Sequence, residues 1–411
     1  MKLKPEANVI ENNMNQITVN EPKLSKRNLY LDYSASTPVD PIVLEKMMSF
    51  FTENFANPSS QHRAGWQSLR AVDGARKQIA QLLKARMPKE IVFTSGASES
   101  NTLAILGFIQ SIKKQFPEKK LHALTSKIEH KSVLETFQQI EELGVEVDYL
   151  QPNSFGQIEI ETVKNSIKDN TVLMSFMWAN NEIGSLNPIK ELSLLSRQYK
   201  ICFHSDATQA CGKFPLDLQN CPVDFISLSG HKMYGPKGVG ALYIRHEGHQ
   251  PAYSIWPIIR GGSQENKIRA GTLNVPGIVG LGEAAEIALT NMTANNFRLE
   301  EITRKFYEDL LKIYPNLKLN GHPIDRIPGH LHLTFPQIRW DQWLPRLSQL
   351  CVSTTSACNS ENIHGSHVLG ALHFSLQEIQ SSLRISLGKF TTEEELAEAL
   401  GLFQKVFKEN Q

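Results

Sequence analysis

The sequence predicts an α/β protein with a large, mostly parallel sheet and a second, smaller α+β domain. Three observations lead to this prediction. The chain has 411 residues, more than one hydrophobic core usually holds. Short apolar segments typical of strands alternate with amphipathic segments typical of helices. Beyond about residue 290 this pattern loosens and a long charged helix follows, which indicates a different domain.

In the large domain, the predicted strands are short apolar segments that end in turn residues. They cover residues 90–96, 172–179, 201–207 and 224–230, and helical patterns such as 98–114 and 189–200 lie between them. Strands that alternate with helices favour parallel crossovers. We therefore place a large domain at residues 46–292.

The smaller domain begins with a predicted charged helix at residues 295–314. Strands at 330–335 and 382–387 and a final helix from Thr391 complete it. We place it at residues 28–45 together with 293–411, so that it carries the loop around Cys358. Residues 1–27 are polar and lack periodicity, which predicts a flexible N-terminal arm.

Bulk composition excludes several classes of protein. Hydrophobic residues make up 41% of the chain, and 43 Lys and Arg nearly balance 42 Asp and Glu. No global basic charge indicates nucleic-acid binding. No apolar run reaches the roughly 18 to 20 residues needed to cross a membrane, and the first residues resemble neither a signal peptide nor a transit peptide. We expect a cytoplasmic protein.

Polar clusters follow several predicted strands, at the sheet edge where α/β proteins bind ligands. Lys232 lies in SGHKMYGPKGVG, between Ser229, His231 and several glycines. An isolated lysine is usually a solvated surface residue. A lysine held in a partly desolvated pocket is instead the nucleophile that forms Schiff bases. The second reading is that of a pyridoxal-5′-phosphate (PLP) enzyme.

Two further clusters fit such a site. In DATQ, Asp206 is either a turn former or the anionic partner that keeps a PLP pyridine nitrogen protonated, with Gln209 near the ring oxygen. SGASES, residues 95–100, is either an ordinary helix start or a phosphate cradle with the Ser98 hydroxyl as a donor. It matches no nucleotide-binding motif.

Histidine and cysteine supply the remaining candidates. His130 follows a presumed strand; a lone histidine is most often structural, but in a PLP site it would stack on the ring and move protons. Of five cysteines, Cys202 lies in an apolar strand and is read as core. Cys358 lies among Ser, Thr, Asn and Gly, which indicates an attacking thiol. Zinc on Cys358, His364 and His367 lacks a fourth ligand, so we predict no metal site.

Ten segments, in one order from about Tyr30 to Phe390, resemble the cysteine desulfurases of the NifS/IscS type. These are PLP enzymes of aminotransferase class V with the type I aspartate-aminotransferase fold. The segments are LDYSASTPVDP, NPSSQHRAG, EIVFTSGASES, EHKSVL, WANNEIG, DATQ, SGHKMYGPKG, RAGTLNVP, SAC and SSLRISLG.

The resemblance implies a role for each matching position. Lys232 would carry PLP, and His130 would stack on its ring and shuttle protons. Arg384 would bind the substrate carboxylate. The other implied cofactor contacts are Asp206 at the pyridine nitrogen, Gln209 at the ring hydroxyl, Ala97, Ser98, Ser229 and His231 at the phosphate, Asn181 at both cofactor and substrate, and Thr272 at the phosphate of the other subunit in a homodimer. Asn57 would help to bind the substrate.

The implied reaction takes L-cysteine to L-alanine and leaves a persulfide on Cys358. The sulfur would then pass to an acceptor protein for iron–sulfur cluster or other sulfur-compound biosynthesis. Four positions depart from the family pattern: Thr102, Gly329 and His332 replace Asn, and Thr355 replaces Gly. The alternatives are a selenocysteine lyase, another class V aminotransferase, or an inactive partner of a sulfur carrier. Cys358 argues against an aminotransferase, and the intact site argues against an inactive partner.

Overall fold

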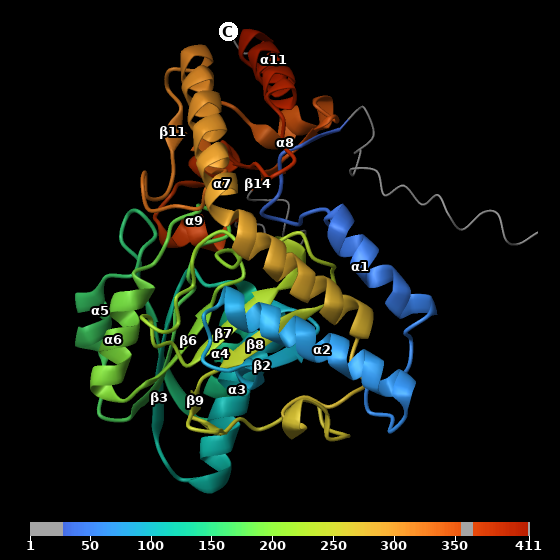
Figure 1. Ribbon diagram of the computed structural model, residues 1–411. Helices are drawn as coiled ribbons and strands as arrows, with labels where there is room; N and C mark the ends of the chain where they lie inside the picture. Colours follow the sequence, from blue (N-terminus) through green and yellow to red (C-terminus); the bar gives the residue numbers. More distant parts are fainter. Residues whose placement is uncertain (1–27, 355–364, 410–411) are drawn as a thin grey trace, which may run out of the picture.

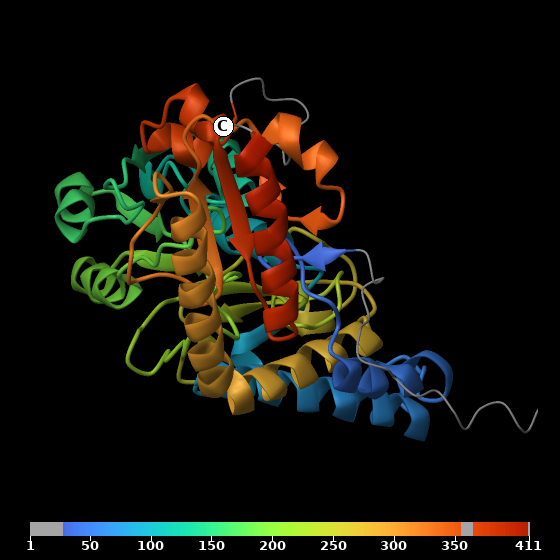
Figure 2. The same ribbon diagram turned by 90° about the horizontal axis from the view of Figure 1, so that it is seen from above.

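A computed structural model describes residues 28–354 and 365–409 (Figures 1 and 2). Its large domain is built on a seven-stranded sheet in the order β2-β8-β7-β6-β5-β3-β4. Only β8 runs against its neighbours β7 and β2 in this sheet, so the predicted mostly parallel sheet is confirmed. The strands are β2 (Ile91–Thr94), β3 (Leu121–Ser126), β4 (Val145–Leu150), β5 (Thr171–Ser175), β6 (Cys202–Asp206), β7 (Phe225–Ser229) and β8 (Gly240–Ile244).

Helices cover both faces of this sheet, and a buried apolar cluster lies on each side. One cluster joins α1, α2, α5, α6 and the start of α7, and the other joins α3 and α4. Figure 1 shows α2 and α7 crossing in front of the sheet. The bounds are α1 (Pro41–Thr52), α2 (Arg63–Leu82), α3 (Ala97–Gln115), α4 (Lys131–Glu142), α5 (Ile160–Ser166), α6 (Ile189–Tyr199) and α7 (Val275–Ile313).

The central strands and their helices follow directly from residue patterns. Every residue of β6 and β7 is buried, as expected for parallel strands that are covered on both faces. In α4 the buried side chains Val133, Phe137 and Ile140 recur at helical spacing and form one apolar stripe. These strands end beside one another, which brings the polar residues at their carboxyl ends together.

The smaller domain has an antiparallel sheet in the order β11-β12-β15-β14. The end of α7 and α11 (Glu393–Glu409) pack against it in a separate apolar cluster. Its strands are β11 (Lys318–Leu319), β12 (His330–Thr334), β14 (Ser353–Thr354) and β15 (Ser382–Ser386), while β1 (Leu29–Tyr30) pairs with β13 (Leu350–Cys351). The remaining short elements are β9 (His246–Glu247), β10 (Gln250–Pro251), α8 (Trp340–Trp343), α9 (His367–Ala371) and α10 (Leu376–Gln380).

Helix α7 differs from its prediction. It begins at Val275 instead of residue 295, because Asn274 caps its first turn and a proline stands among its first residues. Its first part packs in the large-domain cluster and its last part in the small-domain cluster. The domain boundary that we propose between residues 292 and 293 therefore falls inside a continuous helix (Figure 2).

No helix in the described part of the chain is long and apolar enough to span a bilayer.

Candidate active site

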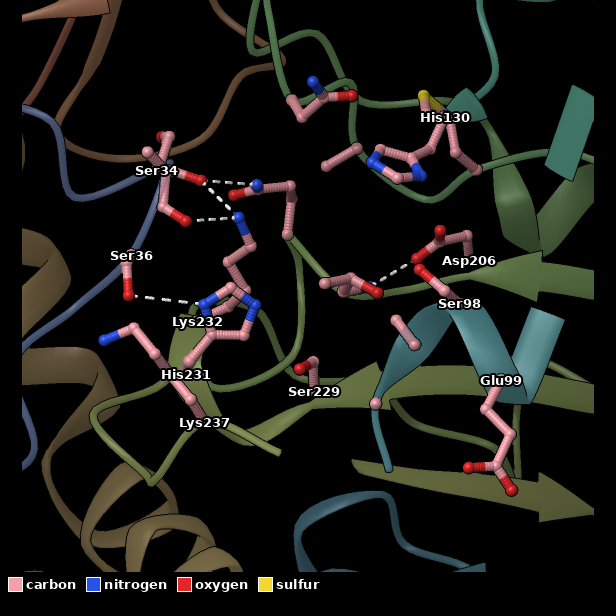
Figure 3. A pocket seen from close by; sticks show the side chains of 18 of the residues that line it. Ser34, Ser36, Ser98, Glu99, His130, Asp206, Ser229, His231, Lys232 and Lys237 are labelled. Carbon is pink, nitrogen blue, oxygen red and sulfur yellow. Dashed lines mark hydrogen bonds between the residues drawn. The ribbon is translucent and has the colours of Figure 1, made fainter. Parts of the chain in front are cut away.

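A cavity of about 700 Å³ lies where the parallel strands end (Figure 3). The structure brings most of the predicted site residues together around it. Those lining it are Ala97, Ser98, His130, Asn181, Asp206, Gln209, Ser229, His231, Lys232 and Arg384. Because these residues come from many separate elements, their convergence is a property of the fold.

Two of the predicted residues in the described part of the chain are not part of this cluster. Asn57 and Thr272 are exposed and do not line the cavity. The Asn57 Oδ1 accepts a hydrogen bond from the backbone N–H of Ser59 at 2.9 Å. Cys358, the predicted sulfur-accepting residue, lies outside the described residues.

Lys232 follows β7 in a short 3₁₀ turn and points toward the chain segment that precedes α1. Its Nζ donates to the carbonyl oxygens of Ser34 at 2.7 Å and Ala35 at 2.8 Å (Figure 3). The Gln209 Nε2 donates to the same Ser34 carbonyl at 2.9 Å. Ser34 and Ala35 were not predicted as site residues, although they lie in the matching segment LDYSASTPVDP.

Asp206 ends β6 as a buried carboxylate, with 6% of its surface exposed. It accepts hydrogen bonds from Asn101 Nδ2 at 2.8 Å and from the backbone N–H of Thr208 at 2.9 Å. Within residues 28–354 and 365–409 it forms no ion pair. A buried anion with only neutral partners is stabilised by a cation placed beside it.

The start of α3 forms the phosphate-binding candidate. Gly96 precedes α3 and offers no side-chain cap, so the first backbone N–H groups of α3 are available to an anion. The neighbouring Glu99 is paired with Arg269 at 2.8 Å, which neutralises its charge. Burial opposes ionisation of Glu99, but hydrogen bonds from Arg269 and Ser95 lower its pKa overall.

Gly240 on β8 allows the chain to pass directly beneath this turn. A Cβ atom at Gly240 would lie 2.5 Å from the Leu228 carbonyl oxygen and 2.7 Å from the Gly96 Cα. Both neighbours are backbone atoms that cannot rotate away. A side chain at this position would therefore displace the turn that precedes α3.

His130 caps α4 and faces the cavity. Its Nδ1 accepts from the backbone N–H of Ser132 at 3.2 Å, so the neutral ring carries its proton on Nε2. Desolvation lowers the pKa of His130, with Asp206 opposing the shift and Lys232 adding to it. The imidazole is therefore neutral at pH 7.

His231, next to Lys232 in the chain, also lines the cavity. Burial is the main cause that lowers the pKa of His231 to about 4, and the positive charges of Lys232 and Lys237 add to it. Its Nδ1 lies 3.3 Å from the Ser36 hydroxyl. This histidine is neutral at pH 7 and acts as a hydrogen-bonding group.

Arg384 reaches the cavity from β15 and is 6% exposed. Its Nη2 donates to Asp32 Oδ1 at 2.7 Å and to Ser353 Oγ at 2.9 Å, and its Nη1 donates to the Asn181 carbonyl oxygen at 3.0 Å. Asp32 was not predicted as a site residue, because nothing in its local pattern indicates a partner 352 residues away.

Three of the four departures from the family pattern lie in described segments. The Thr102 hydroxyl donates to the Ser98 carbonyl oxygen at 3.0 Å. Gly329 has φ +78°, a conformation that favours glycine. The His332 Nδ1 accepts from the Asn320 amide at 2.9 Å. Each position is accommodated locally; Thr355 lies outside the described residues.

Comparison with known families gives the assignment. The family model described as aminotransferase class V matches residues 29–398, nearly the whole chain. The chain belongs to the class V aminotransferases. The type I PLP-enzyme fold expected from the sequence is thus confirmed.

Relatives within this family are cysteine desulfurases. The chain is 44% identical over 380 residues to the cysteine desulfurase IscS of Shewanella loihica, which covers 92% of each chain. A solved NifS-like protein superposes with a TM-score of 0.84 at 34% identity, covering 93% of this chain and 99% of that one. The structure of SspA in complex with cysteine gives a TM-score of 0.77 at 38% identity over 88% and 99%.

Class V aminotransferases depend on PLP, and the residues present fit this cofactor. Lys232 offers an amine, Asp206 a buried anion, and the start of α3 a cradle of N–H groups. Thr208, which the sequence analysis passed over within DATQ, lines the same cavity. Its buried hydroxyl has no hydrogen-bond partner in the described segments, as expected where a bound ligand completes the site.

Proposed function

We propose that this class V enzyme removes the sulfur atom of L-cysteine and releases L-alanine. The observation that carries the proposal is the convergence of Lys232, Asp206, His130 and Arg384 on one cavity. These residues supply an amine, a buried anion, a neutral imidazole and a guanidinium. Such groups are needed to hold PLP and an amino acid in the same site. The desulfurase relatives, at 44% identity, support cysteine as that amino acid.

The geometry of the cavity supports the proposed cofactor contacts. Lys232 holds PLP through its amine and Asp206 pairs with the pyridine nitrogen. When bound, PLP withdraws electrons from the substrate α-carbon. The other proposed contacts are Gln209 with the ring hydroxyl, Asn181 at the ring and substrate, and Ala97, Ser98, Ser229 and His231 at the phosphate.

Arg384 and His130 act on the substrate. The Arg384 guanidinium binds its carboxylate by charge-assisted hydrogen bonds, and Asn57 assists in binding. His130 is neutral and exposed to the cavity, so it takes up or returns a proton near neutral pH. The Lys232 amine is the second proton carrier, because its Nζ lies in the same cavity.

The sulfur acceptor within the chain is Cys358. Its thiolate attacks the substrate sulfur, so an S–S bond forms while the carbon–sulfur bond breaks. The electron pair of that bond stays with the carbon, which gains a proton and leaves as alanine. The persulfide on Cys358 then passes its outer sulfur to an acceptor protein for iron–sulfur cluster or other sulfur-compound biosynthesis. A free thiol suits the cytoplasm, where thiols stay reduced.

We also propose a homodimer in which Thr272 reaches the cofactor phosphate of the partner. Exposed apolar side chains on and beside α1 and α2 support this proposal, because a partner subunit would bury them. Phe51 is 58% exposed, Phe55 74% and Trp66 52%. Groups of large exposed apolar side chains mark interaction surfaces. Thr272 is also exposed and lies outside the cavity of its own chain.

The test is a single-turnover incubation with L-cysteine. Alanine should form, and mass spectrometry should find one extra sulfur on the peptide that carries Cys358. Cys358→Ser should still bind PLP and cysteine but give neither product, because a serine oxygen is a poor nucleophile toward divalent sulfur. Extra sulfur on Cys202, Cys211, Cys221 or Cys351 would overturn the role of Cys358. Absence of alanine from the wild type would overturn the proposed function.

A further inference from the structure

The carboxylate-binding arginine already holds a carboxylate of its own chain. Asp32 Oδ1 accepts from Arg384 Nη2 at 2.7 Å, and Asp32 Oδ2 accepts from the Ser353 hydroxyl at 2.9 Å. Side-chain exposure is 8% for Arg384 and 17% for Asp32. Water therefore screens this ion pair only weakly.

Asp32 is the anion that balances the charge of Arg384. His332 lies directly opposite Arg384 on the neighbouring strand β12. Burial lowers the pKa of His332 to about 3 and that of His330 to well below its usual value, with Arg384 and Arg326 adding to both shifts. Both rings are therefore neutral at pH 7, and within the described segments Asp32 is the ion-pair partner of Arg384.

The Nη donors of Arg384 are already committed. Its Nε is buried and has no hydrogen-bond partner in the described part of the chain, so a ligand does not reach it. An incoming carboxylate must therefore share the two Nη groups with Asp32, Ser353 and the Asn181 carbonyl oxygen. Two carboxylates on one guanidinium repel each other, and at low exposure this repulsion is strong.

We propose that Asp32 sets the affinity of the site for amino-acid carboxylates by competing with them for Arg384. This inference rests on the proposed role of Arg384. Asp32 orients the guanidinium through one hydrogen bond and weakens its hold on a ligand through its charge. The amino-acid product, which carries the same carboxylate as the substrate, is then released more readily.

The experiment measures binding of L-alanine and of ethylamine to the PLP-loaded enzyme, followed by the visible absorbance of the cofactor. Ethylamine is alanine without its carboxylate. Asp32→Asn keeps a hydrogen-bond acceptor of the same shape and removes the charge. The Kd for alanine should fall about tenfold, because like-charge repulsion at a desolvated site is removed. The Kd for ethylamine should stay unchanged.

Matched variants separate charge from contact. Ser353→Ala removes the neutral neighbour of the same guanidinium and should not tighten alanine binding, and Asp32→Glu should return affinity toward the wild-type value. Equal tightening by Ser353→Ala would overturn the proposal. If Asp32→Asn fails to fold, as judged by cofactor content and circular dichroism, Asp32→Ser removes the same charge and supplies the test.

Arg384→Ala separates a failure of the proposed role of Arg384 from a failure of the proposed role of Asp32. It should raise the Kd for alanine about thirtyfold or more and leave ethylamine unchanged. If alanine binds to it as tightly as to the wild type, the proposed role of Arg384 is wrong. A second outcome is that Arg384→Ala weakens alanine binding while Asp32→Asn leaves it unchanged or makes it weaker. In that case Arg384 binds the carboxylate, and the proposed competition by Asp32 is wrong.

Discussion

The Lys232 Nζ lies 2.7 Å from the carbonyl oxygen of Ser34, 198 residues earlier in the chain. Ser34 belongs to the segment that leads from β1 to α1, and the same segment supplies Asp32 to Arg384. A short stretch near the start of the described chain thus contacts both the proposed cofactor lysine of the large domain and the proposed substrate arginine of the smaller one. Its backbone carbonyl groups accept hydrogen bonds from Lys232, and its Asp32 side chain accepts one from Arg384.

Lys232 should be the residue that binds the cofactor covalently. Purified protein is expected to be yellow, and borohydride reduction should fix the cofactor to the peptide that contains Lys232. Lys232→Ala should lose the visible absorbance of the wild type, because the Schiff-base amine is removed. Lys237, which lines the same cavity, provides the matched control: Lys237→Ala should keep the band. Label on Lys237 in the wild type would contradict the assignment.

Alkylation should distinguish Cys358 from the four described cysteines. Burial raises the pKa of Cys211 to about 12, that of Cys221 to about 11 and that of Cys202 well above its usual value, and it also raises the pKa of Cys351. Their thiols stay protonated and unreactive at pH 8. Brief treatment of the folded enzyme with iodoacetamide should therefore modify Cys358 and abolish alanine release. Rapid labelling of Cys202 in the folded state would refute this prediction, and unfolded protein should label at all five cysteines.

Stability should fall as the pH drops below about 6.5. Burial lowers the pKa of His204 to about 4 and that of His332 to about 3, whereas both titrate near 6.5 when unfolded. Between these values the unfolded chain binds protons that the native chain does not, so acid favours unfolding. Each histidine contributes about 1.4 kcal/mol per pH unit to the slope of the free energy of unfolding against pH.

His332→Asn should remove one such contribution from the pH dependence of urea unfolding between pH 6.5 and 5. The measurement compares the free energy of unfolding of the variant and the wild type at several pH values with equal cofactor. His249→Asn, at an exposed position, is the control and should keep the wild-type slope. The same slope in His332→Asn would show that His332 does not stay neutral in the folded protein.

The exposed apolar side chains on and beside α1 and α2 should be needed for dimer formation. Phe55→Glu should weaken association by about 2 kcal/mol for each exchanged side chain, the usual value for burying one aromatic residue. Sedimentation equilibrium across a range of concentrations measures this change. Ile324, which is 82% exposed in the connection between β11 and β12, gives a control. Equal effects of Phe55→Glu and Ile324→Glu would place the dimer interface elsewhere.

Local sequence pattern predicts much of this protein because strands and strand ends are local features. The apolar segments that became β2, β5, β6, β7, β12 and β15 are recognisable by their length and by the turn residues that follow them. In a parallel sheet the carboxyl ends of neighbouring strands lie side by side. Sequence alone therefore predicts that Lys232, Asp206 and the start of α3 form one group.

Other features depend on contacts between distant parts of the chain. The start of α7 was missed because the apolar stretch after Val275 packs on α1 and α2 and shows only weak helical periodicity. The pairing of Asp32 with Arg384 is set by where β15 and the segment after β1 meet. A sequence fixes which residue types are near each other along the chain. Only tertiary packing decides which buried charge faces which, since that depends on contacts hundreds of residues apart.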